Sequence, residues 1–313
     1  MLSFFEALVA NPLLLAALFA GLAASVVSGI IGSYVVVKRI AFISGSISHS
    51  VLGGIGFCLW LERAKDVTWA SPLYGALIAA ILSAVIIGWI RLHYRQREDS
   101  VIAALWSIGM AVGVLFISQT PGFNVELTNF LIGNILWVTS TDLYILWGLD
   151  LAVILLVLCL HKRFLAICFD EEQAQLQGVP VNSLYMLLLI LIAVSIVLLI
   201  QVVGIILVMT MLTLPAAIAN LFTSRLSSMM MIAIGISGFF CVLGNGTAYY
   251  LDWPTGATIA LLVGMAYVVS LIFFQNRKGS LALKKKGLEC LHSKPDAERE
   301  GFEPSIPFRG MRP

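Results

Sequence analysis

Charged residues are scarce in this chain. Asp, Glu, Lys and Arg make up 12% of its 313 residues, hydrophobic residues make up 60%, and the mean hydropathy is +0.98. Soluble globular domains carry about 25% charged residues, so this composition excludes an ordinary soluble domain. The net charge of +2 adds no pattern that favours nucleic-acid binding.

Two motifs that would indicate a particular chemistry are also missing. The five cysteines form no CxxC pair and mostly lie in apolar segments, which favours small buried side chains over a metal site. No GxxxxGK[ST] motif is present, so the chain has no P-loop to bind a nucleotide phosphate. If ATP drives this protein, the ATPase is a separate chain and this chain is not itself the enzyme.

The chain has long apolar runs instead. An α-helix needs about 20 apolar residues to cross a bilayer, and runs of about that length recur at residues 13–37, 40–61, 69–92, 100–118, 142–161, 183–200, 203–221, 228–250 and 255–275. A further apolar piece at residues 126–139 is too short to span comfortably. The pattern predicts an all-α polytopic membrane helix bundle of eight or nine spans plus a short segment on the outer side, with the first run retained as a span.

Basic residues in the short loops predict the orientation of the bundle. Lys and Arg gather in loops that all lie on one side if the N-terminus is outside, and this side is then cytoplasmic. They are Lys38, Arg39, Arg91, Arg95, Arg97, Lys162, Arg163, Arg225, Arg277 and Lys278. Nine spans place the C-terminus in the cytoplasm.

The stretch "KRIAFISGSISHSVLGGIGF", residues 38–57, contains a histidine inside an apolar segment. Ser46, His49, Ser50 and Gly53 are spaced so that a helix places them on one face. Small residues allow helices to approach closely in lipid, and an ionisable group in hydrocarbon costs at least a few kcal/mol. His49 is therefore expected to face protein or a water-filled path, either as a hydrogen-bonded bundle residue or as a transient ligand of a transition metal.

The stretch "CFDEEQAQLQGVPVNS", residues 168–183, is a long polar interruption between two spans on the predicted cytoplasmic side. Acidic residues at its start suit the N-terminus of a short helix, and Gly178 and Pro180 end that helix. Two interpretations stay open, a plain solvated loop and a docking element for a separate ATPase.

These features together resemble the membrane subunits of manganese, zinc and iron ABC importers. Residues 38–57 are similar to the FxGDxxSHxxLPG segment of these permeases, and the similarity extends over residues 8–275 through "NFLIGNILWVTSTDL", "DEEQAQLQGV", "VGIILVMTMLTLPAAIA" and "YYLDWPTGATIALL". The resemblance implies a permease of the bacterial inner membrane that imports a divalent metal ion as its substrate and holds no permanent cofactor. It implies as partners a cytoplasmic ATP-binding subunit, a second permease and an extracytoplasmic metal-binding protein.

The resemblance also implies roles for particular residues. His49, with Asp252 at the outer end of a span, is expected to bind the metal transiently, and Ser46, Ser50 and Gly53 are expected to line its pathway. Asp252 is as well suited to capping a loop. The residues expected to couple the permease to the ATPase are Asp170, Glu171, Ala174 and Gly178.

The chain departs from the family at acidic positions. Ser46 stands where the family usually has Asp, and Asn134 stands where many relatives read Asp. A divalent cation that leaves water needs compensating charge, so these departures favour a second permease of a different sequence that retains the carboxylates. Asp150, in the middle of a span, is expected to have a structural pairing partner.

The sequence changes from apolar to charged near residue 276. Residues 1–276 are expected to form the transmembrane domain, and residues 277–313 a disordered cytoplasmic tail whose basic start can contact anionic membrane lipid.

A secondary metal or solute transporter without an ATPase is the alternative function, although no internal repeat supports it. An intramembrane enzyme is a third class, suggested by Ser46, Ser48 and His49, but no oxyanion-hole motif accompanies them.

Overall fold

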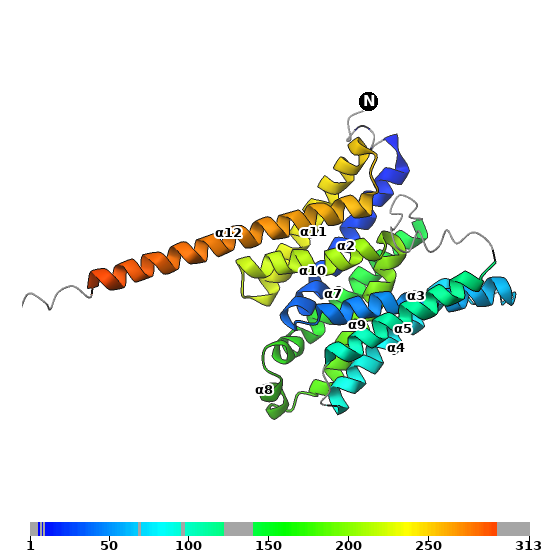
Figure 1. Cartoon of the computed structure of the whole chain (residues 1–313), viewed down its shortest axis with the longest axis horizontal. Coiled ribbons are helices and arrows are strands. Elements are labelled where there is room, and N and C mark those ends of the chain that lie inside the picture. The colour runs from blue at the N-terminus through cyan, green and yellow to red at the C-terminus, as the bar shows by residue number, and fades with distance from the viewer. Residues whose placement is uncertain are drawn as a thin grey trace, which may run out of the picture. The chain divides into compact units, whose positions relative to one another are not determined.

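The computed structural model describes residues 6, 8, 10–67, 70–94, 98–121 and 140–292, and these residues form helices joined by short turns, with no strand among them. The helices are α2 (Pro12–Val37), α3 (Ala41–Ala64), α4 (Pro72–His93), α5 (Glu98–Gln119), α7 (Ser140–Phe169), α8 (Glu171–Leu176), α9 (Val181–Val203), α10 (Ile205–Phe222), α11 (Leu226–Leu251) and α12 (Thr255–His292) (Figure 1). Within the described ranges, nine helices are long and apolar enough to cross a membrane. The predicted all-α membrane bundle is thus confirmed, whereas the predicted short segment at 126–139 lies outside the described residues.

Local sequence signals set several helix boundaries. Asn11 caps α2, because its side chain accepts a hydrogen bond of 3.0 Å from the amide of Leu13, and Pro12 fits the first helical position. Ser71 and Pro72 begin α4 in the same way. Between α9 and α10 the chain turns at Gly204, which has φ of +82°, a value that glycine adopts without steric cost. The apolar runs predicted at residues 183–200 and 203–221 are therefore two helices, as expected.

The helices divide into an inner and an outer set. The most apolar part of α9 is largely buried and carries Leu188, Leu189 and Ile192 in the core. α3 is less apolar than α5, yet most of its spanning stretch is buried inside the bundle, whereas most of α5 is not. Hydropathy alone would rank α3 as the poorer membrane helix, and burial inside the bundle explains how its serines and glycines are tolerated.

Glycines allow α3 to lie almost in backbone contact with its neighbours α4 and α5. A Cβ atom on Gly54 would lie 2.0 Å from the carbonyl oxygen of Gly75 in α4. A Cβ atom on Gly56 would lie 2.7 Å from the carbonyl oxygen of Gly113 in α5. Such distances exclude any side chain, so these contacts are the small-residue helix packing typical of membrane proteins.

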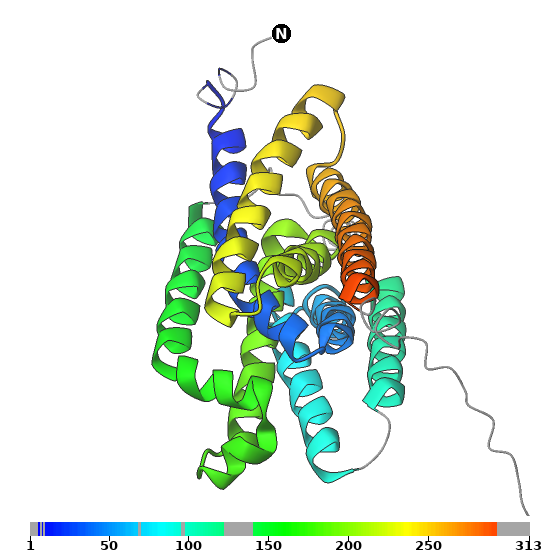
Figure 2. The same ribbon diagram turned by 90° about the vertical axis from the view of Figure 1, so that its left-hand side faces the viewer.

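Residues 1–267 form one compact unit, and residues 268–313 form a second unit that is described separately. In the first unit, α7 (green) lies on one side of the bundle and α5 (teal) on the other (Figure 2). α12 continues as helix to His292, beyond residue 276, where the sequence predicts that the transmembrane domain ends. The division at residue 276 stays a prediction, and residues 293–313 lie outside the described part of the chain.

We expect Gly54→Ala to destabilise the bundle, because the added methyl group would overlap the backbone of α4. Overpacking of this kind costs about 1–3 kcal/mol, which thermal unfolding in detergent would detect. Gly148→Ala in α7 is the matched control, since a Cβ atom at Gly148 meets nothing within 4 Å. Equal melting temperatures for the two variants would contradict the close α3–α4 contact.

Candidate functional site

His49 lies in α3 with its side chain half-buried, and its ring stacks on the indole of Trp106 in α5. The ring centroids are 4.3 Å apart and the planes differ by 17°. Within the described residues, no hydrogen bond to the imidazole of His49 is found. Stacking occupies one face of the ring and leaves its edge, which carries both nitrogens, available to a ligand.

Gly45 makes room for this stacked pair. A Cβ atom on Gly45 would lie 3.1 Å from the indole of Trp106 and 3.0 Å from the terminal methyl of Met209 in α10. The glycine one turn before His49 thus lets Trp106 settle against α3. No pattern in the sequence selects Trp106, because only the packing of α5 on α3 brings its indole to the histidine.

Ser46, Ser50 and Gly53 pack α3 against α5, whereas the sequence predicts that they line a pathway. Ser46 is fully buried and its hydroxyl donates to the carbonyl of Ile102 at 2.9 Å. The hydroxyl of Ser50 donates to the carbonyl of Leu105 at 3.2 Å, and a Cβ atom on Gly53 would lie 3.0 Å from a carbonyl of α5. In this subunit the small residues therefore hold two helices together, and a pathway role for them stays a prediction.

Asp252 lies at the end of α11, exposed and in the left-handed region at φ of +52°. It borders a cavity of about 280 Å³ that is also lined by Leu14, Asn245, Tyr249 and Trp253. Across the described residues, no group of three or more His, Cys, Asp or Glu side chains lies close enough to hold a metal ion. His49 is not among the residues that line the cavity beside Asp252, and the metal role of each stays a prediction.

The predicted cytoplasmic helix is present as α8, and both of its ends are capped. The carboxylate of Asp170 accepts the amide of Gln173 at 2.9 Å, as an N-cap residue does. At the other end, Gly178 has φ of +78°, its amide donates to the carbonyl of Gln175, and the amide of Val179 donates to the carbonyl of Ala174. This pair of bonds is a Schellman motif, and the side chain of Ala174 is buried against the bundle.

Two basic residues from other helices hold α8 in place. The carboxylate of Glu171 forms ion pairs with Lys38 at the end of α2 and, at 3.1 Å, with Arg91 at the end of α4. The loops that the charge pattern assigns to one side of the membrane thus meet at one end of the bundle. On the outward side of α8, Leu176 is 89% exposed.

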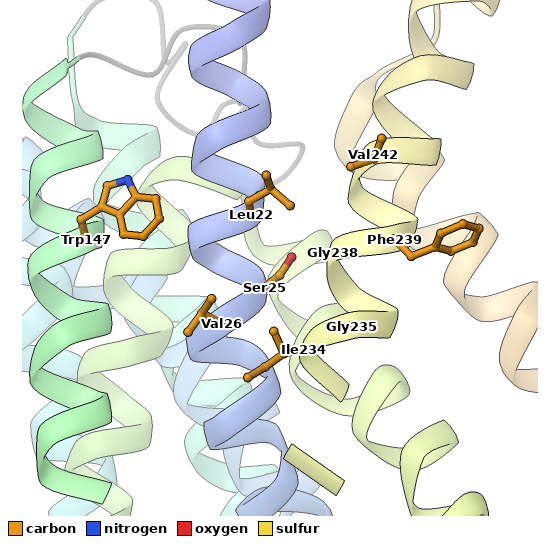
Figure 3. Close-up of a pocket in the computed structure, with 9 residues that line it drawn as sticks. All are labelled: Leu22, Ser25, Val26, Trp147, Ile234, Gly235, Gly238, Phe239 and Val242. Carbon is orange, nitrogen blue, oxygen red and sulfur yellow. The ribbon is translucent and has the colours of Figure 1, made fainter. Parts of the chain in front are cut away.

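A groove on another part of the bundle has no metal-binding chemistry. It has a volume of about 480 Å³ and lies along α2, between Trp147 of α7 and Phe239 and Val242 of α11 (Figure 3). Its lining is apolar apart from Ser25, whose hydroxyl already donates to the carbonyl of Gly21 at 2.7 Å. A divalent cation would find no charged ligand there.

The structure does not show the pairing partner expected for Asp150. This residue of α7 is 3% exposed and lies near the backbone of Val27 in α2. Neither carboxylate oxygen meets hydrogen-bond geometry with any residue in the described ranges. The prediction of structural pairing is therefore not supported.

Among the described residues, nine apolar helices of spanning length and a capped surface helix at one end of the bundle define a multi-pass membrane protein. A family model described as the ABC 3 transport family matches residues 10–274. The chain belongs to the ABC 3 transport family, and it is thus the permease subunit of a bacterial ABC importer whose ATPase is a separate subunit.

Individual relatives agree with this assignment. The chain is 50% identical over 261 residues to a "probable metal transport system membrane protein" of Chlamydia muridarum, covering 83% of this chain and 89% of the relative. It is 31% identical to the manganese transport system membrane protein MntC of Halalkalibacterium halodurans, covering 91% and 94%. A solved structure of PsaBC from Streptococcus pneumoniae in complex with Fab is similar, with a TM-score of 0.75, 30% identity and coverage of 85% and 94%. The resemblance seen in the sequence is confirmed.

We expect Gly178→Val to unravel the end of α8, because a β-branched residue rarely adopts positive φ. Gly178→Asn is the control, since asparagine tolerates the left-handed region. Hydrogen exchange of the Val179 amide, which donates to Ala174, would report the change. Faster exchange is expected in the valine variant alone, and equal protection in both variants would contradict the assigned cap.

Proposed function

We propose that this chain is the transmembrane permease subunit of an ATP-driven importer for a divalent transition metal, Mn(II), Zn(II) or Fe(II), which it receives from an extracytoplasmic binding protein. His49 is the observation that carries the metal assignment. Its imidazole lies inside a span, on a helix held by close packing, with its ring face against Trp106. Imidazole nitrogen suits Zn(II) and Fe(II), whereas Mn(II) prefers oxygen ligands such as carboxylates, and the names of the relatives favour a metal substrate.

A second permease completes the proposed site. A neutral imidazole supplies no compensating charge for a divalent cation, and Ser46, at the position where the resemblance predicts Asp, is a hydroxyl bonded to the backbone of α5. Because no group of three or more His, Cys, Asp or Glu side chains that could hold a metal ion is found among the described residues, we expect the carboxylates to come from another chain. We infer a second permease of different sequence opposite α3, so that the ion is held between His49 and acidic ligands of that partner. Such a site binds weakly enough to release the ion again.

The ATPase is proposed to dock on α8. A six-residue helix with caps at both ends is a rigid element, and its anchoring through Glu171 fixes its orientation on the bundle. Leu176 presents an apolar side chain to the outside, with Glu172 and Gln175 exposed beside it. Apolar residues at the centre of an interface with a polar rim are typical of contacts that carry binding energy.

We expect His49→Ala to abolish metal uptake while the complex still assembles, because the imidazole is the proposed ligand and its removal leaves the α3 backbone contacts intact. The measurement is uptake of radiolabelled Mn(II), Zn(II) and Fe(II) into proteoliposomes that contain the complete transporter and its binding protein. His93→Ala is the control, since His93 is an exposed histidine at the end of α4. Uptake at the wild-type rate in the His49 variant would show that His49 is a packing residue only.

We expect Leu176→Asp to release the ATPase, because a charge replaces the apolar side chain at the proposed interface. Loss of one well-packed contact residue costs about 2 kcal/mol or more, and co-purification of the ATPase with the tagged permease would measure it. Gln175→Asp adds the same charge to the neighbouring residue. If both variants lose the ATPase equally, the added charge is responsible and Leu176 is not the anchor.

A further inference from the structure

Glu171 of α8 connects this short helix to three spans. Its carboxylate accepts hydrogen bonds from the ammonium group of Lys38 at the end of α2 and, at 3.1 Å, from the guanidinium group of Arg91 in the last turn of α4. Both cations lie over the ring of Tyr185 in α9, Arg91 at 4.0 Å and Lys38 at 6.0 Å from the ring centroid. We call these four side chains the Glu171 cluster.

The Glu171 cluster differs from an ordinary surface ion pair. The side chain of Lys38 is only 7% exposed and that of Arg91 24% exposed. Exposed pairs contribute little because water screens them, whereas a buried cation that loses its carboxylate is left uncompensated. We therefore expect a displacement of Glu171 to displace Lys38, and a displacement of Lys38 to displace Glu171.

Lys38 also leads directly into the helix that carries His49. α2 ends at Val37 and α3 begins at Ala41, and the turn between them is tight, with Arg39 at φ of +59° and the amide of Ile40 bonded to the carbonyl of Val35 at 3.0 Å. A turn so short and so fully hydrogen-bonded does not absorb a displacement. Movement of Lys38 is thus transferred to the first turn of α3, about two turns before His49.

We propose that Glu171 is a positioning residue for transport, which carries the displacement of α8 through Lys38 to α3 and through Arg91 to α4. The proposal rests on the proposed function, in which the ATPase moves α8. α8 has six residues and cannot by itself reach the metal site, so the energy of ATP requires a connection of this kind. The cluster provides one from a carboxylate on α8 to the start of the helix that carries His49.

The test uses the complete transporter with its ATPase. Glu171→Gln alone leaves Lys38 without its carboxylate and can impair folding, so the central variant is the double substitution Lys38→Met with Glu171→Gln, which removes both charges and is tolerated better than a broken pair. Asp99→Asn is the control, because Asp99 is an exposed carboxylate in the first turn of α5, outside both the docking surface and the Glu171 cluster. A fluorescent amino acid at position 42, where Phe42 in the first turn of α3 is 72% exposed, reports movement of α3 without reference to any substrate.

In the double variant, we expect the ATPase to co-purify and to hydrolyse ATP, while the ATP-dependent signal at position 42 disappears and metal transported per ATP falls by about tenfold, within the range of coupling between linked sites. The Asp99→Asn variant should behave as wild type in both measurements. An unchanged signal at position 42 in the double variant would overturn the proposal. If the wild-type signal responds to ATP but none of the three metals is transported, the proposed function is wrong while the connection through Glu171 stands.

Discussion

The bundle depends on the close approach of helix backbones at α3. Helices in lipid gain little from burying apolar surface against one another, so their association relies on close packing and on satisfied polar groups. α3 provides both, with Gly54 against Gly75 of α4, Gly56 against Gly113 of α5, and a serine hydroxyl bonded to a carbonyl of α5. Because glycines and serines take up this packing face, α3 is held firmly despite its low hydropathy, and His49 is held with it.

The proposed functions, metal binding and ATPase docking, lie on two different helices. α3 carries His49, the proposed metal ligand, on a closely packed backbone, and α8 carries the proposed docking surface at one end of the bundle. Transport requires a site that holds an ion briefly and then changes shape. The physical link between the two helices is short, because Lys38 both pairs with Glu171 and ends the helix that precedes α3.

Much of the fold could be predicted from the sequence, since its signals are local. The spans follow from runs of apolar residues, the break at Gly204 from the glycine, and α8 from Asp170 at its start and Gly178 at its end. The arrangement of the candidate site was harder to predict from the sequence. Helical periodicity shows that Ser46 and His49 share one face. It does not show that this face packs on α5, or that the hydroxyl of Ser46 donates a hydrogen bond to a backbone carbonyl there.

The sequence by itself determined the membrane-spanning class, the capped helix ends and the family, because hydropathy, capping and motifs are properties of neighbouring residues. Only the tertiary structure decided which side chains meet. Glu171 forms ion pairs with Lys38, 133 positions away in the sequence, and with Arg91, 80 positions away. The ring of His49 stacks on Trp106 of another helix. These contacts depend on how each helix is rotated and shifted along its neighbour. Close backbone contacts at glycines set this rotation and shift, and the sequence of one helix alone does not determine them.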